Sequence, residues 1–326
     1  MSHEGFVCVC VLCVLCPSVR PPIVHQCNLQ KVQQIAALAI TGALRTSPND
    51  YVDIHAGIFP IELALLKACH GAAVHALTLP STNPIYQVVQ NAKQNQPNKH
   101  PGPIDKLLKL FSLHNTKLET IYPAITLEKL SPLHTLQTDN SREASINSER
   151  LDKADFKIFS DGSGHDNGVG TSAILYEKGR ACPLKSLKFF MGNSDEHNTY
   201  KAEIVGAILA LWILNYTPAT LGKRVSLYTD NQSLVTMLPH PKVTSGQYLL
   251  GLLHSAINST GCRLTIKWIS GHGKVKGNEA ADRMAKDTAT GCSSPRISLP
   301  HALMNPLPSS ASALKQGFSS TPSNMG

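Results

Sequence analysis

Four acidic residues in the second half of the chain are placed where they could act together. They are Asp161, Glu203, Asp230 and Asp282. Carboxylates that gather in a fold repel one another and raise each other's pKa, so a cluster of four implies bound cations. Magnesium prefers such oxygen ligands, and two ions about 3.5–4 Å apart can drive phosphodiester hydrolysis. The residue types therefore predict metal-dependent phosphoryl chemistry if the fold brings the four together.

Two of these acids end predicted strands. Residues 156–160 alternate between apolar and polar side chains, which is typical of a half-buried strand, and Asp161 follows, with a turn expected at residues 162–164. Residues 224–229 form a second predicted strand, which stops at Asp230. Asp161 taken alone would more often only cap a turn, because Asp-Gly is a common turn sequence. The recurrence of acids at the ends of elements favours chemistry instead.

The other two acids lie on predicted helices. Glu203 falls within about one turn of the start of an apolar helix, for which Asn198 or Thr199 is the candidate N-cap. Asp282 lies on a helix that begins near Gly277. Helices and strands hold side chains more precisely than loops do, so all four acids would occupy fixed positions.

The order of these motifs resembles the type 1 ribonuclease H family over about residues 154–290. The matched motifs are Asp-Gly-Ser at 161–163, Ala-Glu at 202–203, Asp-Asn at 230–231, Gly-His at 271–272 and Gly-Asn-Glu-Ala-Ala-Asp at 277–282. Five motifs in the family's order are far more specific than any one of them. The chain is most similar in type to the ribonuclease H domain attached to reverse transcriptases of non-LTR retroelements.

The resemblance implies an endonuclease that hydrolyses the RNA strand of RNA/DNA hybrids by a two-metal mechanism. Its cofactor would be two Mg²⁺ ions, for which Mn²⁺ can substitute. The resemblance assigns metal binding and catalysis to Asp161, Glu203, Asp230 and Asp282. It adds His272, in a glycine-flanked loop, as a residue that assists proton transfer or product release, for which a near-neutral pKa is suited. A histidine without that context would more often be structural.

Contacts to nucleic acid are expected around the same motifs. Telling RNA from DNA depends on the 2′-hydroxyl, which small polar groups and backbone amides can recognise. By position, the candidates are Gly162, Ser163, Asn198, Thr199, Asn231 and Lys274. Residues 239–246 offer no basic helix of the kind with which some family members grip the hybrid. We therefore expect phosphate contacts from scattered lysines, namely Lys201, Lys274 and Lys276.

The predicted elements follow the order βββαβααβα. This order gives a mixed five-stranded sheet with helices on its faces, an α/β architecture that matches the ribonuclease H-like fold. The strands are expected at 156–161, 168–176, 181–190, 224–230 and 264–269, and the helices at 199–212, 231–238, 246–258 and from about 277.

Composition divides the chain into five parts. Residues 1–27 form an atypical N-terminus without an assigned function. Residues 28–134 form a predicted helical region, and the family resemblance suggests that it is a remnant of the connection between a polymerase and a ribonuclease H domain. Residues 135–152 have the polar composition of a linker. Residues 153–290 form the predicted catalytic domain, and the Ser- and Pro-rich tail, 291–326, is expected to be disordered.

Other features argue against several functions. The apolar run at residues 7–16 is too short to span a bilayer and lacks the flanks of a signal peptide, and its four cysteines have no second Cys/His pair at zinc-site spacing. No membrane partner is therefore expected, and an intracellular location, nucleus or cytoplasm, is favoured. The sequence contains no pair of adjacent aspartates, so polymerase activity is not predicted. The net charge of +8 suits a polyanionic partner but is weak evidence for one.

Two alternatives remain open. A transposase or integrase of the same fold would place a late glutamate on the final helix, where this chain has Asp282. A catalytically inactive nucleic-acid-binding module left from a retroelement would keep the fold without the chemistry, and the presence of all four acids argues against it. The expected partners are an RNA/DNA hybrid and, through the resemblance, a reverse transcriptase or other retroelement protein.

Overall fold

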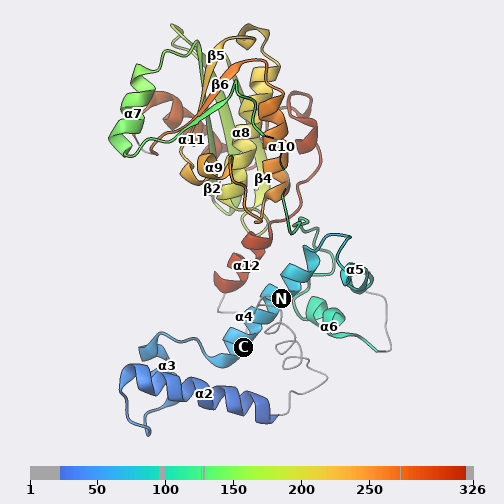
Figure 1. Ribbon diagram of the computed structural model, residues 1–326. Helices are drawn as coiled ribbons and strands as arrows, with labels where there is room; N and C mark the ends of the chain where they lie inside the picture. Colours follow the sequence, from blue (N-terminus) through green and yellow to red (C-terminus); the bar gives the residue numbers. More distant parts are fainter. Residues whose placement is uncertain (1–22, 95–99, 126, 128, 272, 321–326) are drawn as a thin grey trace. The chain divides into compact units, whose positions relative to one another are not determined.

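The chain folds into two compact units. The computed structural model describes residues 23–94, 100–125, 127, 129–271 and 273–320. We call Glu119–Leu314 the sheet unit, and the described residues up to Leu118 together with those from Lys315 the helical unit. Figure 1 shows both with their element labels. The expectations for residues 1–22 and for His272 fall outside the described residues.

A six-stranded mixed sheet forms the centre of the sheet unit, with the strand order β1-β6-β5-β2-β3-β4. Three antiparallel strands and two parallel ones correspond to the five predicted strands: β2 (Phe156–His165), β3 (Gly168–Glu177), β4 (Lys185–Asn193), β5 (Arg224–Thr229) and β6 (Arg263–Trp268). The predicted mixed sheet with helices on its faces is confirmed. The additional strand, β1 (Thr135–Gln137), pairs in parallel with the edge of β6. Three residues are too few to show a period in the sequence.

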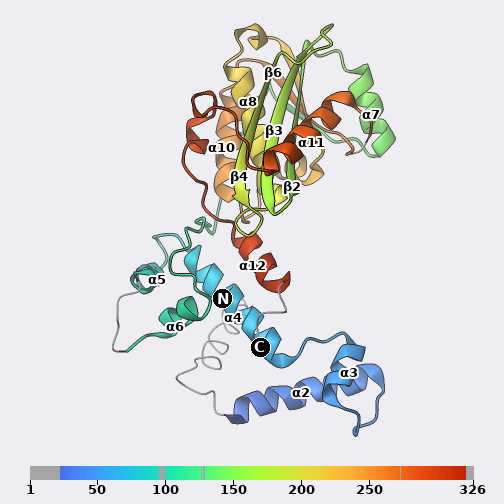
Figure 2. The ribbon, with the colours of Figure 1, turned by 180° about the vertical axis from the view of Figure 1, so that it is seen from behind.

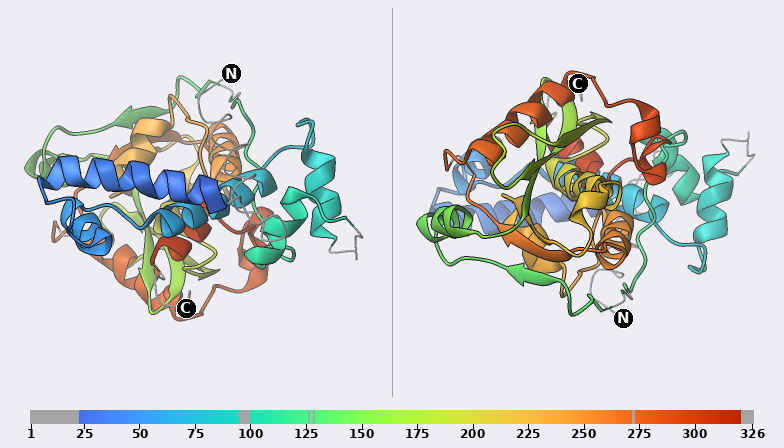
Figure 3. Two further views of the ribbon diagram at one scale, coloured as in Figure 1. Left: turned by 90° about the horizontal axis from the view of Figure 1, so that it is seen from below. Right: turned by 90° about the horizontal axis from the view of Figure 1, so that it is seen from above.

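Helices cover both faces of this sheet. On one face, α8 (Thr199–Asn215) packs between the sheet and α10 (Gln247–Asn258), and on the other lies α11 (Lys276–Ala289). The views in Figures 2 and 3 show the strands between these two helical layers. Because α8 is enclosed by sheet and helix, it is apolar nearly all round and almost completely buried. The short helix α9 (Gln232–Met237) follows β5.

A glycine on β3 allows α11 to approach the sheet closely. A Cβ atom at Gly170 would lie 2.4 Å from the backbone oxygen of Ala285, which is closer than real Cβ atoms come. No side chain therefore fits between strand and helix at this point. This contact fixes the helix that carries Asp282.

The segment expected to be a linker, residues 135–152, is instead structured. Besides β1 it contains α7 (Arg142–Leu151), whose N-cap Ser141 accepts a hydrogen bond from the amide of Ala144 at 3.1 Å. The hydroxyl of Ser145 accepts a hydrogen bond from the amide of Ser270 at 3.1 Å. Polar contacts supply much of what holds the segment, and Leu136 of β1 also packs against the main core. So few apolar residues leave the composition of the segment like that of a linker.

The C-terminal tail also differs from the disordered segment that its composition predicted. Residues 291–314 wrap the sheet unit, and the tail contains η2 (Arg296–Ser298), η3 (His301–Leu303) and α12 (Ala311–Ser320). Leu299 and Leu303 are buried in the main core, and the indole nitrogen of Trp212 donates to the carbonyl of Ser298 at 2.9 Å. Isolated leucines in a Ser- and Pro-rich segment make little difference to its average composition, although they suffice to anchor it. Residues 321–326 lie outside the described part.

The helical unit confirms the predicted helical N-terminal region. It contains α2 (Ile23–Thr41), α3 (Asn49–Ala56), α4 (Ile61–Leu77), α5 (Tyr86–Lys93) and α6 (Pro103–Leu110). Its aromatic contacts centre on His70, which stacks on Phe318 with ring centroids 4.1 Å apart and meets Phe111 edge-on. Among the described residues no single helix is long and apolar enough to cross a membrane, whereas α3 and α4, bent by 57°, pass that test only when they are joined.

Candidate active site

Three of the four predicted carboxylates meet at one end of the parallel strands. Asp161, Glu203 and Asp230 each offer an oxygen atom, and these atoms all lie within 4.8 Å of one another. Strands β2 and β5 are parallel neighbours, and their pairing ends at Ser160 and Thr229, immediately before the two aspartates. The fold therefore brings together acids that are 69 residues apart in the sequence.

The strand that carries Asp161 continues beyond it, where a turn was expected. Residues 162–165 stay paired with β3 along the whole of β2, and the chain reverses only at Asp166 and Asn167, whose φ angles are +47° and +64°. The glycine after the aspartate is there for another reason. A Cβ at Gly162 would lie 2.4 Å from the amide nitrogen of Glu203, so only glycine lets the first turns of α8 touch the strand.

The fourth acid, Asp282, lines the same cleft but is not a member of the group of three. The cleft has a volume of about 200 Å³ and is lined by Asp161, Gly162, Glu203, Asp230, Asn278, Glu279, Asp282 and Lys286. The carboxylate of Asp282 is 32% exposed and forms an ion pair with Lys286 at 2.8 Å, one helical turn further along α11. This pairing leaves Asp282 facing the cluster with its charge already partly balanced.

Burial and mutual repulsion change the pKa values of the clustered acids. Only 4% of Asp161 is exposed, and desolvation, followed by the charges of Asp230 and Asp282, raises its pKa to about 7. The pKa of Glu203 is raised well above its usual range by burial and by the charges of Asp161 and Asp230. A cation among these oxygens would stabilise the ionised forms.

The donor set fits a divalent metal that prefers oxygen. All three candidate ligands are carboxylates, on β2, on α8 and directly after β5, and a cluster of this composition suits Mg²⁺ or Mn²⁺ better than zinc, which favours nitrogen and sulfur. The backbone around the site is also fixed. The indole nitrogen of Trp268 donates to the carbonyl of Asp230 at 3.0 Å, and the hydroxyl of Thr229 lies 3.5 Å from Glu203 Oε2.

Three residues that line the cleft were given no role from the sequence, although the motif at 277–282 contains two of them. Asn278 is 3% exposed, and its Oδ1 atom has no hydrogen-bond partner among the described residues. Glu279 and Lys286 complete the set. All three lie three or four positions from Asp282 on one helix, so helical spacing from that aspartate could have identified them.

The predicted nucleic-acid contacts are only partly available for binding. Asn198 and Asn231 both act as helix N-caps: their side chains accept hydrogen bonds from the amides of Lys201 at 2.9 Å and Leu234 at 3.0 Å. The side-chain nitrogen of Asn198 also donates to the hydroxyl of Ser312 at 2.7 Å. Of the remaining candidates, Gly162 lines the cleft, Ser163 is half-buried, and Thr199 and Lys274 are exposed.

One predicted phosphate contact is wrong. The side chain of Lys201 is completely buried and pairs with Glu119, so it cannot reach a substrate. The expectation assumed that a lysine on a helix turns to solvent, whereas this face of α8 is covered by the chain on both sides of the predicted domain. Lys276 is exposed at the start of α11, as a phosphate contact requires.

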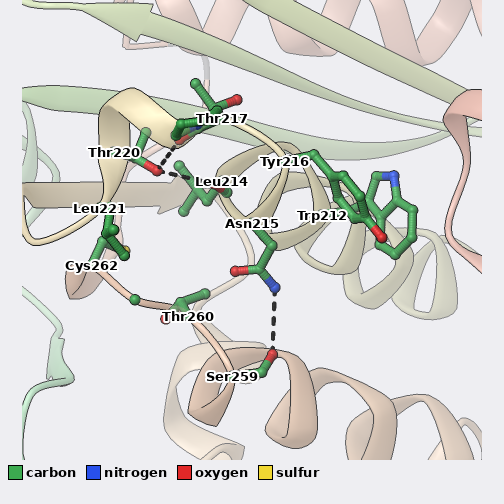
Figure 4. A pocket seen from close by; sticks show the side chains of 12 residues that line it. Trp212, Leu214, Asn215, Tyr216, Thr217, Thr220, Leu221, Ser259, Thr260 and Cys262 are labelled. Carbon is green, nitrogen blue, oxygen red and sulfur yellow. Dashed lines mark hydrogen bonds between the residues drawn. The ribbon is translucent and has the colours of Figure 1, made fainter.

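A second and larger pocket lies away from the carboxylates. It has a volume of about 540 Å³ and is lined by the C-terminal end of α8, the loop that follows it and the turn before β6 (Figure 4). None of the lining residues that the structure describes there carries a carboxylate. Its threonine hydroxyls bond to nearby backbone carbonyls, for example Thr220 to Leu214 at 3.0 Å. This pocket therefore offers no group for the predicted chemistry.

The mixed sheet, its two helical layers and the acids just beyond the last β2–β5 pair define a ribonuclease H-like fold. Residues 153–290 match the model of the RNase H family, which confirms the resemblance that the motifs predicted. No curated protein matches the chain.

Several solved structures are similar to the chain. The N-terminal RNase H domain of a Mycobacterium tuberculosis protein, solved as a fusion with maltose binding protein, is 22% identical and covers 42% of this chain and 95% of that chain, with a TM-score of 0.34. RNase H1 from Halobacterium salinarum is 17% identical, with coverages of 41% and 96% and a TM-score of 0.33. The prototype foamy virus protease-reverse transcriptase is 17% identical, with coverages of 43% and 21% and a TM-score of 0.35.

Proposed function

We propose that the sheet unit hydrolyses the RNA strand of RNA/DNA hybrids at the carboxylate cluster, with two Mg²⁺ ions as cofactor and Mn²⁺ as a substitute. The observation that carries this proposal is the convergence of Asp161, Glu203 and Asp230 to within 4.8 Å in a domain that matches the RNase H family. Asp161 and Glu203 are buried and Asp230 is half-buried, and three acids this close are costly to a fold, so their presence together is best explained by a cation that they bind.

The residues of the cleft would have different roles in metal binding and catalysis. The buried Asp161 and Glu203 and the half-buried Asp230 would hold the ions, while Asp282 would contribute from the rim of the cleft. Bound Mg²⁺ would polarise the phosphoryl oxygens and make the attacking water more acidic. The exposed ammonium of Lys286 would stabilise negative charge on the substrate at the cleft mouth. His272 would assist proton transfer or product release.

Recognition of RNA would use groups that the fold leaves free. The candidate groups are the backbone at Gly162 and the hydroxyls of Ser163 and Thr199, which lie close to the clustered acids in the sequence and are accessible to different extents. The side chains of the two N-cap asparagines already accept hydrogen bonds from backbone amides. Small groups of this kind suit the shallow groove in which the 2′-hydroxyl lies. A reverse transcriptase or other retroelement protein is proposed as a partner.

The different-class alternative is an inactive nucleic-acid-binding module. A direct test is Mg²⁺-dependent cleavage of a labelled RNA/DNA hybrid by the full chain, with duplex DNA and duplex RNA as substrates for comparison. Asp161→Asn should abolish cleavage while it leaves hybrid binding largely intact, because it removes a charge without changing the shape of the side chain. Asp166→Asn, an exposed turn residue, is the matched control. Binding of the hybrid by an unchanged chain that never cleaves it would favour the inactive module.

A further inference from the structure

The N-terminal turn of α8 is held from outside the matched RNase H region by a buried ion pair. The ammonium of Lys201 lies 3.6 Å from Glu119 Oε2, and both side chains are completely inaccessible to solvent. Glu119 precedes residues 153–290, over which the family match extends. A buried ion pair is expensive to desolvate, so it persists only where other hydrogen bonds satisfy its remaining atoms.

Those other hydrogen bonds come from a second flank and from the start of α10. Glu119 Oε1 accepts from the amide of Ala311 at 2.9 Å and from the hydroxyl of Ser245, and Oε2 accepts from the amide of Gly246 at 2.8 Å. The Lys201 ammonium donates to the carbonyl of Pro308 at 2.9 Å. Each charged group therefore has hydrogen-bond partners besides the other, and the flanks that precede and follow the matched region supply some of them.

The same helical turn carries a proposed metal ligand on its opposite side. Lys201 and Glu203 are two positions apart, so their side chains point in directions that differ by about 200° around the helix. Asn198, the N-cap of α8, is held at the same time by Ser312 at 2.7 Å. Any tilt or fraying of this turn would move the Glu203 carboxylate relative to Asp161, which lies within β2, and Asp230, which directly follows β5.

We propose that Glu119 and the segment 308–312 are positioning elements of the active site, which clasp Lys201 so that Glu203 stays within reach of the metal. We call this arrangement the clasp. The inference rests on the proposed function, and it adds that the functional unit extends well beyond residues 153–290. Neither Glu119 nor Lys201 lines the cleft, so both act through the position of Glu203.

The test uses the full chain with Glu119→Gln, Lys201→Met and the double variant. Three quantities are measured. Calorimetry gives the Mn²⁺ affinity, and cleavage assays give the Mg²⁺ concentration for half-maximal cleavage and the KM for the hybrid. Each single variant should weaken metal binding about 10- to 100-fold, the range typical when a partner that orients a metal ligand is lost. The KM for the hybrid measured at saturating Mg²⁺ should change less than about threefold, because the clasp lies outside the substrate cleft. The double variant should be no worse than either single one, since all three lose the same contact.

A matched control separates positioning from general destabilisation. Asp152 pairs with Lys267 at 3.3 Å in another nearly buried ion pair of the sheet unit, and it accepts a hydrogen bond from Tyr228 at 2.6 Å. Asp152→Asn should lower the unfolding temperature but leave Mn²⁺ affinity unchanged. Equal loss of Mn²⁺ affinity in this control, or unchanged affinity in both folded clasp variants, would overturn the proposal.

The two proposals fail in different ways. If the unchanged chain binds Mn²⁺ but cleaves no hybrid, the proposed function fails, while a loss of Mn²⁺ affinity in Glu119→Gln still supports the clasp. If the unchanged chain neither binds Mn²⁺ nor cleaves, both are overturned. If a single variant is too unstable to measure, the double variant decides, because removal of both charges avoids leaving one buried and unpaired. Wild-type metal affinity in that folded double variant would show that the ion pair does not position Glu203.

Discussion

Replacing Asp161 with asparagine should make the metal-free protein more stable while it destroys the proposed activity. The pKa of Asp161 is raised from 3.8 to about 7, first by burial and then by the charges of Asp230 and Asp282. A shift of that size corresponds to a cost of about 4 kcal/mol for the ionised side chain in the folded state. Because Asp161 shares this repulsion with its neighbours, and water can enter the cleft, we expect a gain of about 1–3 kcal/mol from the substitution.

The direction of the pH dependence follows from the raised pKa. The folded state holds the proton more tightly than the unfolded state, so wild-type stability is greatest below the unfolded pKa and falls as the pH rises through about 7. The advantage of Asp161→Asn in a chelator should therefore be largest at pH 8 and shrink toward pH 5. Added Mg²⁺ should stabilise the wild type and have little effect on the variant.

Tryptophan fluorescence offers an assay specific for the sheet unit. The chain has two tryptophans, Trp212 and Trp268, and both belong to this unit. A gain of about 2 kcal/mol corresponds to a rise of about 4–8 °C in the unfolding temperature for a domain of this size. Asp166→Asn, on an exposed turn, should change it by less than a degree or two. An Asp161→Asn variant no more stable than wild type in chelator at pH 8 would refute the repulsion on which the metal site is argued.

Three further predictions concern the boundaries of the unit and its cleft. A fragment of residues 150–292, the domain that the sequence alone suggests, should be largely unfolded, while the fragment 119–314 should fold. The shorter fragment loses one partner of a buried ion pair, at a cost of about 3–5 kcal/mol, and two buried leucines, at about 1.5–3 kcal/mol each. These losses are comparable with a total stability of about 5–15 kcal/mol. Circular dichroism and urea unfolding of both fragments decide this, and equal stability would mean that the flanks are dispensable. Lys286→Met removes the ion-pair partner of Asp282 and should lower the half-saturating Mg²⁺ concentration about two- to threefold, which corresponds to the free energy of an exposed ion pair. Cleavage titrations with Mg²⁺ measure this concentration, and an increase in it would contradict the prediction. His272→Ala should slow turnover without eliminating it, and complete loss of Mg²⁺-dependent cleavage in a folded variant would make His272 essential.

The local sequence determined the elements and the chemistry that they carry. Period-2 alternation located β2, a second run that stops at an acid located β5, and the N-cap signal at Asn198 located the start of α8. Acids at these places, in the order of a known family, were enough to predict the mixed sheet and the carboxylates. This was possible because periodicity and caps act over a few residues, and the sequence displays interactions of that range directly.

Tertiary structure alone decided which residues meet across long distances. The glycine after Asp161 indicates a turn in the sequence, but in the fold it is a contact point for α8. Lys201 resembles a surface lysine, and its partner Glu119 lies 82 positions earlier, where no local pattern connects the two. The four-residue spacing of Asp282 and Lys286 on one helix indicates their ion pair in the sequence. The helical spacing does not show, however, that Asp282 lines the same cleft as the other three acids. Ion pairs and close backbone contacts depend on which surfaces the packed core brings together, and that choice is made by the whole fold.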